Sequence, residues 1–244
     1  MMNREEQWMK KRLGMITASE LGDITSASGR IIDGNVAYIR RKRFERNRGY
    51  ALPVSSKAMD VGNETEPMIA EWAKANLDVA RELVYSKDLP EIPFWIAPDC
   101  PLGASPDAFT PDETVEFEFK TLVGNETTEF FCDLYTSYEE KKLRVWKEHG
   151  DQMLGQFIAK PSEQTIVLIK YAPQRDDIMA DTDSPLAEWR GSVFYFARKD
   201  YEASIAEMRK RVILFDAMID AKMSPSEFKS GQWYVSEDGE LKVK

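Results

Sequence analysis

The order of segments along this sequence predicts an α+β fold, in which a mixed central β-sheet is flanked by helices. Helix-like patterns fill the first 77 residues and recur at 139–159 and 200–222. The middle of the chain, from about residue 81 to residue 120, instead holds short β-rich runs separated by proline-containing turns. The chain has 244 residues and is 43% hydrophobic, so we expect one domain with a sizeable core over residues 1–244.

The helices are predicted from capping residues and from apolar side chains at helical spacing. Thr17 and Glu20 form the pattern of a capping box with Thr17 as the N-cap residue, so a helix should follow to about Ile24. A basic helix should end at Gly49. The other expected helices cover residues 4–13, 35–48, 63–77, 139–159 and 200–222.

The strands are predicted from runs of β-branched and aromatic residues between turns. These runs cover residues 81–87, 94–97, 102–109, 114–120, 164–171 and 192–198. Along the fourth run the side chains alternate, because successive side chains of a strand point to opposite faces of the sheet. One face of this strand should carry Val115, Phe117 and Phe119, and the other should carry Glu116, Glu118 and Lys120.

Charge is distributed unevenly along the chain. The net charge of −9 argues against a nucleic-acid partner, but residues 1–57 hold twelve Lys or Arg and only six Asp or Glu. That segment has a net charge of +6, and it can bind phosphate locally even in an acidic protein. The alternative is that its basic helix only presents a solvated face, formed by Arg40, Arg41, Lys42, Arg43, Arg46 and Arg48.

Several protein classes do not fit the composition. Two cysteines, Cys100 and Cys132, are too few for a four-ligand zinc or iron–sulfur site and offer no disulfide framework. No apolar run reaches the ~18 residues of a transmembrane helix. The charged first residues are not followed by the apolar core of a signal peptide. We therefore expect a cytoplasmic protein without a membrane partner.

Two acidic residues and a lysine form the sharpest chemical pattern. Asp107 follows a Ser-Pro turn, and Glu118-Phe119-Lys120 lies on the next predicted strand. A hairpin between the two segments would place Asp107 beside Glu118 and Lys120. Two carboxylates and the Phe119 carbonyl suit Mg²⁺ or Mn²⁺, and a lysine beside the metal can orient an attacking water molecule. Alternating charges on an exposed strand face can also serve solubility alone.

Four motifs follow one another over about residues 8–160. The first is Arg12–Glu20 (RLGMITASE), and the second combines Ser105-Pro106-Asp107 with Glu118-Phe119-Lys120. The third is Gly62–Glu66, of the form Gly-x-x-x-Glu, and the fourth is His149-x-x-Gln152. In this order they resemble the motifs of the phage lambda exonuclease family and its YqaJ-like viral recombinase relatives, within the PD-(D/E)xK nuclease superfamily.

This resemblance implies a restriction-endonuclease-like core and a metal-dependent exonuclease. Such an enzyme digests linear double-stranded DNA in the 5′-to-3′ direction, hydrolysing phosphodiester bonds and leaving 3′ single-stranded DNA for recombination. Residues 58–171 would form the catalytic core. Residues 1–57 would form a basic DNA-end-binding part, and residues 172–244 a C-terminal strand and helix.

The resemblance also implies roles for particular residues. Asp107, Glu118 and the Phe119 carbonyl correspond to ligands of Mg²⁺ or Mn²⁺, with two ions per active site. Lys120 corresponds to the catalytic lysine. Two residues, Glu66 and Gln152, correspond to supporting catalytic residues.

Three further residues, Arg12, Thr17 and Ser19, correspond to the pocket for the 5′-phosphate of the DNA. The free N–H groups at a capped helix start favour such an anion, although Thr17 can serve as a cap alone. Met59 corresponds to an apolar wedge that separates the terminal base pair, with ordinary core packing as the alternative. Arg30 is a weaker candidate for a contact in the minor groove.

The implied partners are double-stranded DNA ends, a homotrimeric ring of this chain and a single-strand annealing protein. The setting would be the cytoplasm of a bacterial host, with the gene carried by a phage or prophage. Two departures put ring assembly in question: Thr121-Leu122 replaces the family's Cys-Pro, and Gln152 is followed by Gln156 rather than by a closer glutamine. The alternatives are a restriction-like endonuclease or resolvase on the same core, and a non-catalytic DNA-end-binding recombination protein.

Overall fold

A five-stranded mixed β-sheet forms the centre of the molecule. The computed structural model describes residues 2–24, 30–51, 57–122, 136–172 and 191–243, and Cys132 lies outside these ranges. The strands follow the order β2 (Val84–Tyr85), β5 (Ala108–Phe109), β6 (Val115–Thr121), β7 (Thr165–Tyr171) and β8 (Gly191–Ala197). β6 and β7 run parallel and the other neighbours run antiparallel, so the predicted mixed sheet is confirmed.

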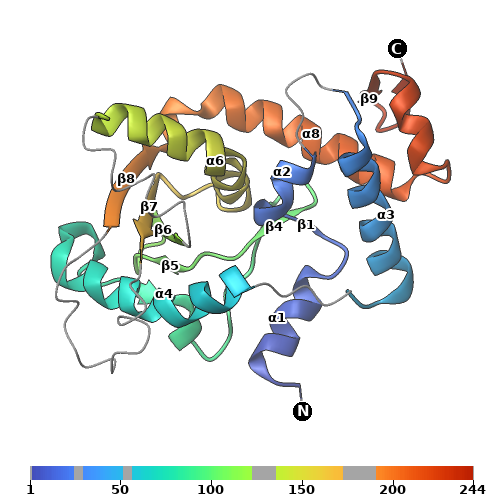
Figure 1. The fold of residues 1–244 in the computed structure, drawn as a ribbon. Helices are drawn as coiled ribbons and strands as arrows, with labels where there is room; N and C mark the ends of the chain where they lie inside the picture. Colours follow the sequence, from blue (N-terminus) through green and yellow to red (C-terminus); the bar gives the residue numbers. More distant parts are fainter. Residues whose placement is uncertain (1, 25–29, 52–56, 123–135, 173–190, 244) are drawn as a thin grey trace.

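Helices cover both faces of this sheet (Figure 1). They are α4 (Lys57–Asn76) on one face, and α6 (Tyr138–Ala159) and α8 (Glu202–Asp220) on the other. Phe117 and Phe119 of β6 belong to the core beneath α4. Leu168 of β7 belongs to a second core, formed with α6 and α8. The predicted alternation along β6 is confirmed, and its charged side chains share the face that α6 covers.

The N-terminal elements pack beside this sandwich. They are α1 (Arg4–Arg12), β1 (Ile16–Thr17), the 3₁₀ turn η1 (Ala18–Glu20), α2 (Leu21–Ile24) and α3 (Asp33–Arg48). β1 pairs in parallel with β4 (Leu102–Ala104), whose other neighbour is β3 (Trp95–Ile96). The remaining elements are the 3₁₀ turns η2 (Asp78–Ala80), η3 (Ser86–Asp88), η4 (Arg198–Asp200) and η5 (Pro225–Ser230), and the hairpin of β9 (Trp233–Val235) and β10 (Leu241–Val243).

Several elements of the structure differ from the sequence predictions, and the strand expected at 81–87 is reduced to β2 before the turn η3. The strand expected at 102–109 is interrupted at Ser105-Pro106-Asp107, because proline has no N–H to donate to a ladder, and its halves join different sheets as β4 and β5. The helix expected after Thr17 is a 3₁₀ turn followed by the four residues of α2. α4 begins at Lys57 rather than at residue 63. The β9–β10 hairpin was not predicted.

The basic helix α3 uses much of its charge inside the protein. Arg43 donates three hydrogen bonds, at 2.6–2.8 Å, to carbonyl oxygens of residues 218, 219 and 223 at the end of α8. Arg46 pairs with Asp216 of α8 at 2.5 Å, and the buried Lys42 pairs with Glu20 of η1 at 3.0 Å. For these three residues the interpretation as a solvated face is wrong, because the side chains hold α3 to neighbouring elements.

We expect Arg43→Met to lower the free energy of unfolding by about 2–3 kcal/mol, because it removes charged donors from the last carbonyls of α8. Urea unfolding followed by circular dichroism measures the change. Arg40→Met is the matched control, since Arg40 is an exposed arginine of the same helix that donates to the exposed Ser226 hydroxyl at 3.2 Å. This control should change stability by less than ~0.5 kcal/mol. Equal losses in the two variants would show that Arg43 has no special role.

Glu116 and Glu163 form a buried carboxyl pair between β6 and the turn after α6. Both residues are 0% exposed, and no third residue in the described ranges donates a hydrogen bond to their carboxyl oxygens. Burial raises the pKa of Glu163 to about 8, against the opposing charges of Arg198 and Lys160. Burial and the neighbouring Glu163 and Glu118 raise the pKa of Glu116 well above its usual range. At neutral pH one carboxyl therefore keeps a proton that it can donate to the other.

The pH dependence of stability follows from this raised pKa. A glutamate in the unfolded chain ionises near pH ~4.3. Below that pH the neutral pair makes its full contribution to the stability of the folded protein. The contribution is lost as the pH rises through about 8, the folded pKa of Glu163. Between about pH 5 and pH 8 the melting temperature of Glu163→Gln should therefore fall less than that of the wild type. Thermal unfolding at both pH values tests this, with the exposed Glu71→Gln as a control. Parallel wild-type and Glu163→Gln curves would contradict it.

Candidate active site

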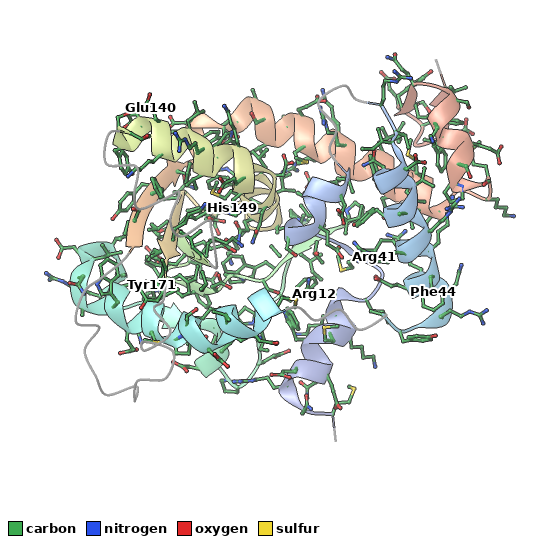
Figure 2. The ribbon with its side chains drawn as sticks, viewed as in Figure 1. Arg12, Arg41, Phe44, Glu140, His149 and Tyr171 are labelled. Carbon is green, nitrogen blue, oxygen red and sulfur yellow. The ribbon has the colours of Figure 1, made fainter. Side chains whose placement is uncertain are left out.

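A cleft of about 560 Å³ brings together predicted site residues that lie far apart in the sequence. It opens between α1, α4, the β4–β5 turn and α6. Figure 2 shows Arg12 at the end of α1 beside the start of α4. The predicted residues that line the cleft are Arg12, Thr17, Ser19, Met59, Glu66, Asp107, Glu118, Lys120 and Gln152.

Glu118 stands at the centre of a polar network on β6. Its Oε1 lies 2.6 Å from the Lys120 Nζ and accepts a hydrogen bond from the Gln152 side-chain amide at 2.6 Å. The Lys120 ammonium also donates to the Gln152 Oε1 at 2.9 Å. Gln156, one turn further along α6, donates to the other Glu118 oxygen. The same glutamine, Gln152, therefore holds both Lys120, the predicted catalytic lysine, and Glu118, a predicted metal ligand.

Asp107 lies beside this network because β5 and β6 form the predicted hairpin. The register pairs Ala108 with Phe117, so Asp107 stands opposite Glu118. Its Oδ2 accepts a hydrogen bond from the Phe119 N–H at 2.7 Å. Burial, and then the charges of Glu118 and Glu66, raise the pKa of Asp107 well above its usual range.

Neighbouring carboxylates also raise the pKa of Lys120, where a raised pKa favours the charged form. Burial alone would lower the pKa of Lys120, but the charges of Glu118 and Asp107 outweigh it and raise this pKa. Lys120 therefore remains a cation at neutral pH. A protonated lysine can donate to a water molecule or to a phosphate oxygen, but it cannot act as a general base.

The donor set fits a divalent cation with oxygen ligands. Asp107 and Glu118 repel each other in a buried setting, and a cation between them would relieve that repulsion. In the described ranges no cluster of three His, Cys, Asp or Glu side chains is arranged to hold a metal ion. The fit therefore rests on this carboxylate pair, with the Phe119 carbonyl as a third candidate ligand.

Glu66 lies on α4 and makes contacts that the sequence did not indicate. It pairs with Lys87 of η3 and accepts a hydrogen bond from the Tyr85 hydroxyl at 3.2 Å. Lys87 also donates to the Asn63 side chain at 2.9 Å and lines the cleft. No motif marks Lys87, because its distance from Glu66 depends on how β2 and α4 pack.

The candidate phosphate-binding residues belong to the wall of the cleft that α1, β1 and η1 contribute. The Arg12 guanidinium stacks over the Trp8 ring at 4.2 Å, and burial lowers the pKa of Arg12. The Thr17 and Ser19 hydroxyl oxygens lie 3.4 Å apart. Because η1 and α2 are short, a helix dipole contributes little here, and anion binding would depend on the side chains and Arg12.

Gly155 allows α6 to approach this wall closely. A Cβ at Gly155 would lie 2.8 Å from the Ala18 Cα and 2.7 Å from the Leu21 side chain. The glycine therefore brings Gln152 and Gln156 close to the η1 segment. Gln156 also lines the cleft, but the motif resemblance assigned it no role. The signal that could have found it is its spacing, one helical turn after Gln152.

Met59, Arg30 and His149 differ in their exposure and in whether they line the cleft. Met59 is 51% exposed, so core packing is wrong for it, and it lines both the cleft and an adjoining cavity of about 220 Å³. Arg30 is exposed and lines neither cavity. His149 lies on the side of α6 that faces the sheet (Figure 2), where burial and the charges of Lys120 and Lys170 lower its pKa to about 3. His149 is therefore neutral at physiological pH.

Comparisons with known proteins identify the fold. No protein-family model and no curated protein sequence matches this chain. An alkaline exonuclease from Laribacter hongkongensis matches with a TM-score of 0.62 and 21% identity over 92% of this chain and 95% of its own. Its structure with dAMP matches with a TM-score of 0.64 and 22% identity over the same shares, 92% and 95%. A phage-related exonuclease from Haemophilus somnus 129PT matches with a TM-score of 0.53 and 15% identity over 84% and 95%. This chain therefore has the fold of these exonucleases.

Within the described ranges, no helix is long and apolar enough to cross a membrane.

Proposed function

We propose that this chain is a metal-dependent exonuclease that digests linear double-stranded DNA from its 5′ ends and leaves 3′ single strands for recombination. One observation carries the proposal: Asp107, Glu118, Lys120 and Gln152 meet in a single cleft through direct contacts. The shared fold supports it, since the similar structures are named as exonucleases and one contains dAMP. A nucleotide is the product class that such a reaction releases.

Asp107, Glu118 and the Phe119 carbonyl would hold Mg²⁺ or Mn²⁺, with two ions per site as the proposed number. When bound, the metal supplies the Lewis acidity for phosphodiester hydrolysis. Lys120 would orient the attacking water and stabilise charge on the phosphate, because its ammonium stays protonated beside the carboxylates. Gln152 would keep Lys120 and Glu118 in place.

Arg12, Thr17 and Ser19 would bind the 5′-phosphate of the DNA, with Met59 as the wedge at the terminal base pair. Arginine suits a phosphate because it can donate two parallel hydrogen bonds. All four residues line the same cleft as Asp107 and Lys120, which supports the assignment. The proposal extends to a homotrimeric ring and to a single-strand annealing protein from a phage or prophage. Light scattering that found only monomer at micromolar concentration would contradict the ring.

The function is tested by digesting one linear duplex in three forms, with Mg²⁺ or with EDTA. The forms carry a 5′-phosphate, carry a 5′-hydroxyl, or are covalently closed into a circle. We expect Mg²⁺-dependent loss of the 5′-phosphorylated linear strand alone. Cutting of the circle would favour a restriction-like endonuclease or resolvase. DNA binding without any cutting would favour a non-catalytic end-binding protein.

We expect Arg12→Ala combined with Ser19→Ala to slow digestion of 5′-phosphorylated ends about a hundredfold, because charged hydrogen bonds to the phosphate are lost. General duplex binding should change far less, since it does not depend on the end. Initial rates on phosphorylated and hydroxyl ends, beside binding to an internal duplex, measure the difference. Equal losses on both kinds of end would rule out the 5′-phosphate assignment.

A further inference from the structure

The face of α6 that meets the sheet carries a polar side chain on each of three successive turns. Glu148, Gln152 and Gln156 stand four residues apart, so they lie on one side of the helix. Gln152 and Gln156 both donate to Glu118 of β6. Glu148 pairs with Lys170 of β7. Three polar contacts in a row therefore link α6 to the two parallel strands, in addition to its apolar packing.

Lys170 is the neighbour of Lys120 in the sheet. The parallel register of β6 and β7 pairs Lys120 with Lys170, so both side chains point to the face that α6 covers. His149 lies near both lysines, whose charges lower its pKa. The two ammonium groups therefore occupy one polar layer beneath α6.

The surroundings of the two lysines differ. Lys120 lines the cleft, whereas Lys170 is only 3% exposed and does not line it. A buried ammonium is costly unless it is paired, and Glu148 supplies a counter-charge. Lys170 thus cannot reach a substrate in the cleft directly, but its ion pair acts on the helix that carries Gln152.

We propose that Glu148 and Lys170 are a positioning pair for the active site, an inference that rests on the proposed exonuclease function. The ion pair fixes the position of α6 along β6 and β7, so that the Gln152 side chain can contact Lys120 and Glu118 at the same time. Those contacts measure 2.9 Å and 2.6 Å, so a small shift of the helix lengthens one of them. Displacement of a reacting group by a fraction of an ångström is enough to lower a catalytic rate strongly.

The first test compares Glu148→Gln and Lys170→Met with the wild type on the linear phosphorylated duplex. We expect kcat to fall about tenfold in each variant, with KM within about twofold, because alignment is lost and DNA contacts are not. Glu113→Gln is the matched control: Glu113 is a half-exposed carboxylate that pairs with Lys160 at the other end of α6. The control should retain the wild-type kcat. Wild-type rates in Glu148→Gln and Lys170→Met, or an equal loss in Glu113→Gln, would overturn the proposal.

The second test asks whether the pair acts through Gln152. In a Gln152→Ala background, adding Glu148→Gln should cause no further loss of kcat, because the side chain being positioned is already absent. A further tenfold loss in that background would overturn the proposal, since it would mean that Glu148 acts by another route. Melting temperatures of all variants separate this effect from simple unfolding, and Glu148→Gln alters only a half-exposed side chain.

The activity of the wild-type protein distinguishes a failure of the positioning role from a failure of the proposed exonuclease function. If the wild type digests the duplex and Glu148→Gln does so equally fast, only the positioning role fails. If the wild type digests none of the DNA forms with Mg²⁺ or Mn²⁺, the proposed function fails and the positioning role fails with it.

Discussion

Lys120→Met is expected to lower the rate of DNA hydrolysis about a thousandfold, because it removes a cation that contacts both Glu118 and Gln152. Methionine keeps the length and apolar stem of the side chain, so the packing of β6 should survive. Duplex binding should change by less than about threefold, since Lys120 acts on the reacting group rather than on the length of the DNA. Single-turnover rates at saturating protein measure the hydrolysis step, and fluorescence anisotropy measures binding.

The controls for this variant are two other substitutions. Lys74→Met removes a half-buried lysine of α4 that pairs with Glu71 and does not line the cleft, so it should leave the rate unchanged. Lys120→Arg keeps a cation but changes its shape, so it should recover only part of the activity. If Lys120→Met retained more than about a tenth of the wild-type rate, the role assigned to Lys120 in hydrolysis would be wrong.

Asp107→Asn is expected to abolish hydrolysis, with a loss of about a thousandfold or more, and at the same time to raise stability in EDTA. The loss of activity follows from removal of a candidate metal ligand. The gain in stability follows from the raised pKa of Asp107, which burial and the charges of Glu118 and Glu66 cause. The asparagine oxygen can still accept the hydrogen bond from the Phe119 N–H.

The sign of the stability change depends on pH. A carboxyl with a raised folded pKa stabilises the protein fully below its unfolded pKa of ~3.9, and this contribution is lost as the pH rises. Near neutral pH, Asp107→Asn should therefore raise the melting temperature in EDTA by about 2–4 °C, the shift that ~1 kcal/mol gives in a chain of this size. Near pH ~4 the difference should shrink.

Metal binding provides the internal check on Asp107. Added Mg²⁺ or Mn²⁺ should raise the melting temperature of the wild type, because a ligand that binds only the folded state stabilises it. The same ions should have little effect on Asp107→Asn. An equal rise in both proteins would mean that Asp107 is not a ligand, whatever the variant does to activity.

Several features followed from local sequence alone. Alternation along residues 114–120 was enough to separate the buried Phe117 and Phe119 from the charged Glu118 and Lys120, because side-chain direction in a strand repeats every two residues. The turn before Asp107 and the register of the following hairpin were also local. These short-range patterns predicted the mixed α+β fold and the group of Asp107, Glu118 and Lys120, whereas the other predicted residues of the cleft came from the resemblance of the motifs.

Packing decided what local patterns could not. Whether the arginines of α3 faced solvent depended on where α8 ended, and Arg43 turned out to hold the last carbonyls of that helix. The partners of Glu66 and the setting of Lys170 likewise depended on elements distant in sequence. A charged residue has many sequence-compatible partners, and only the tertiary structure selects the one that burial makes necessary. The sequence by itself thus determined the chemical groups of the candidate site, and the fold determined which groups hold them in place.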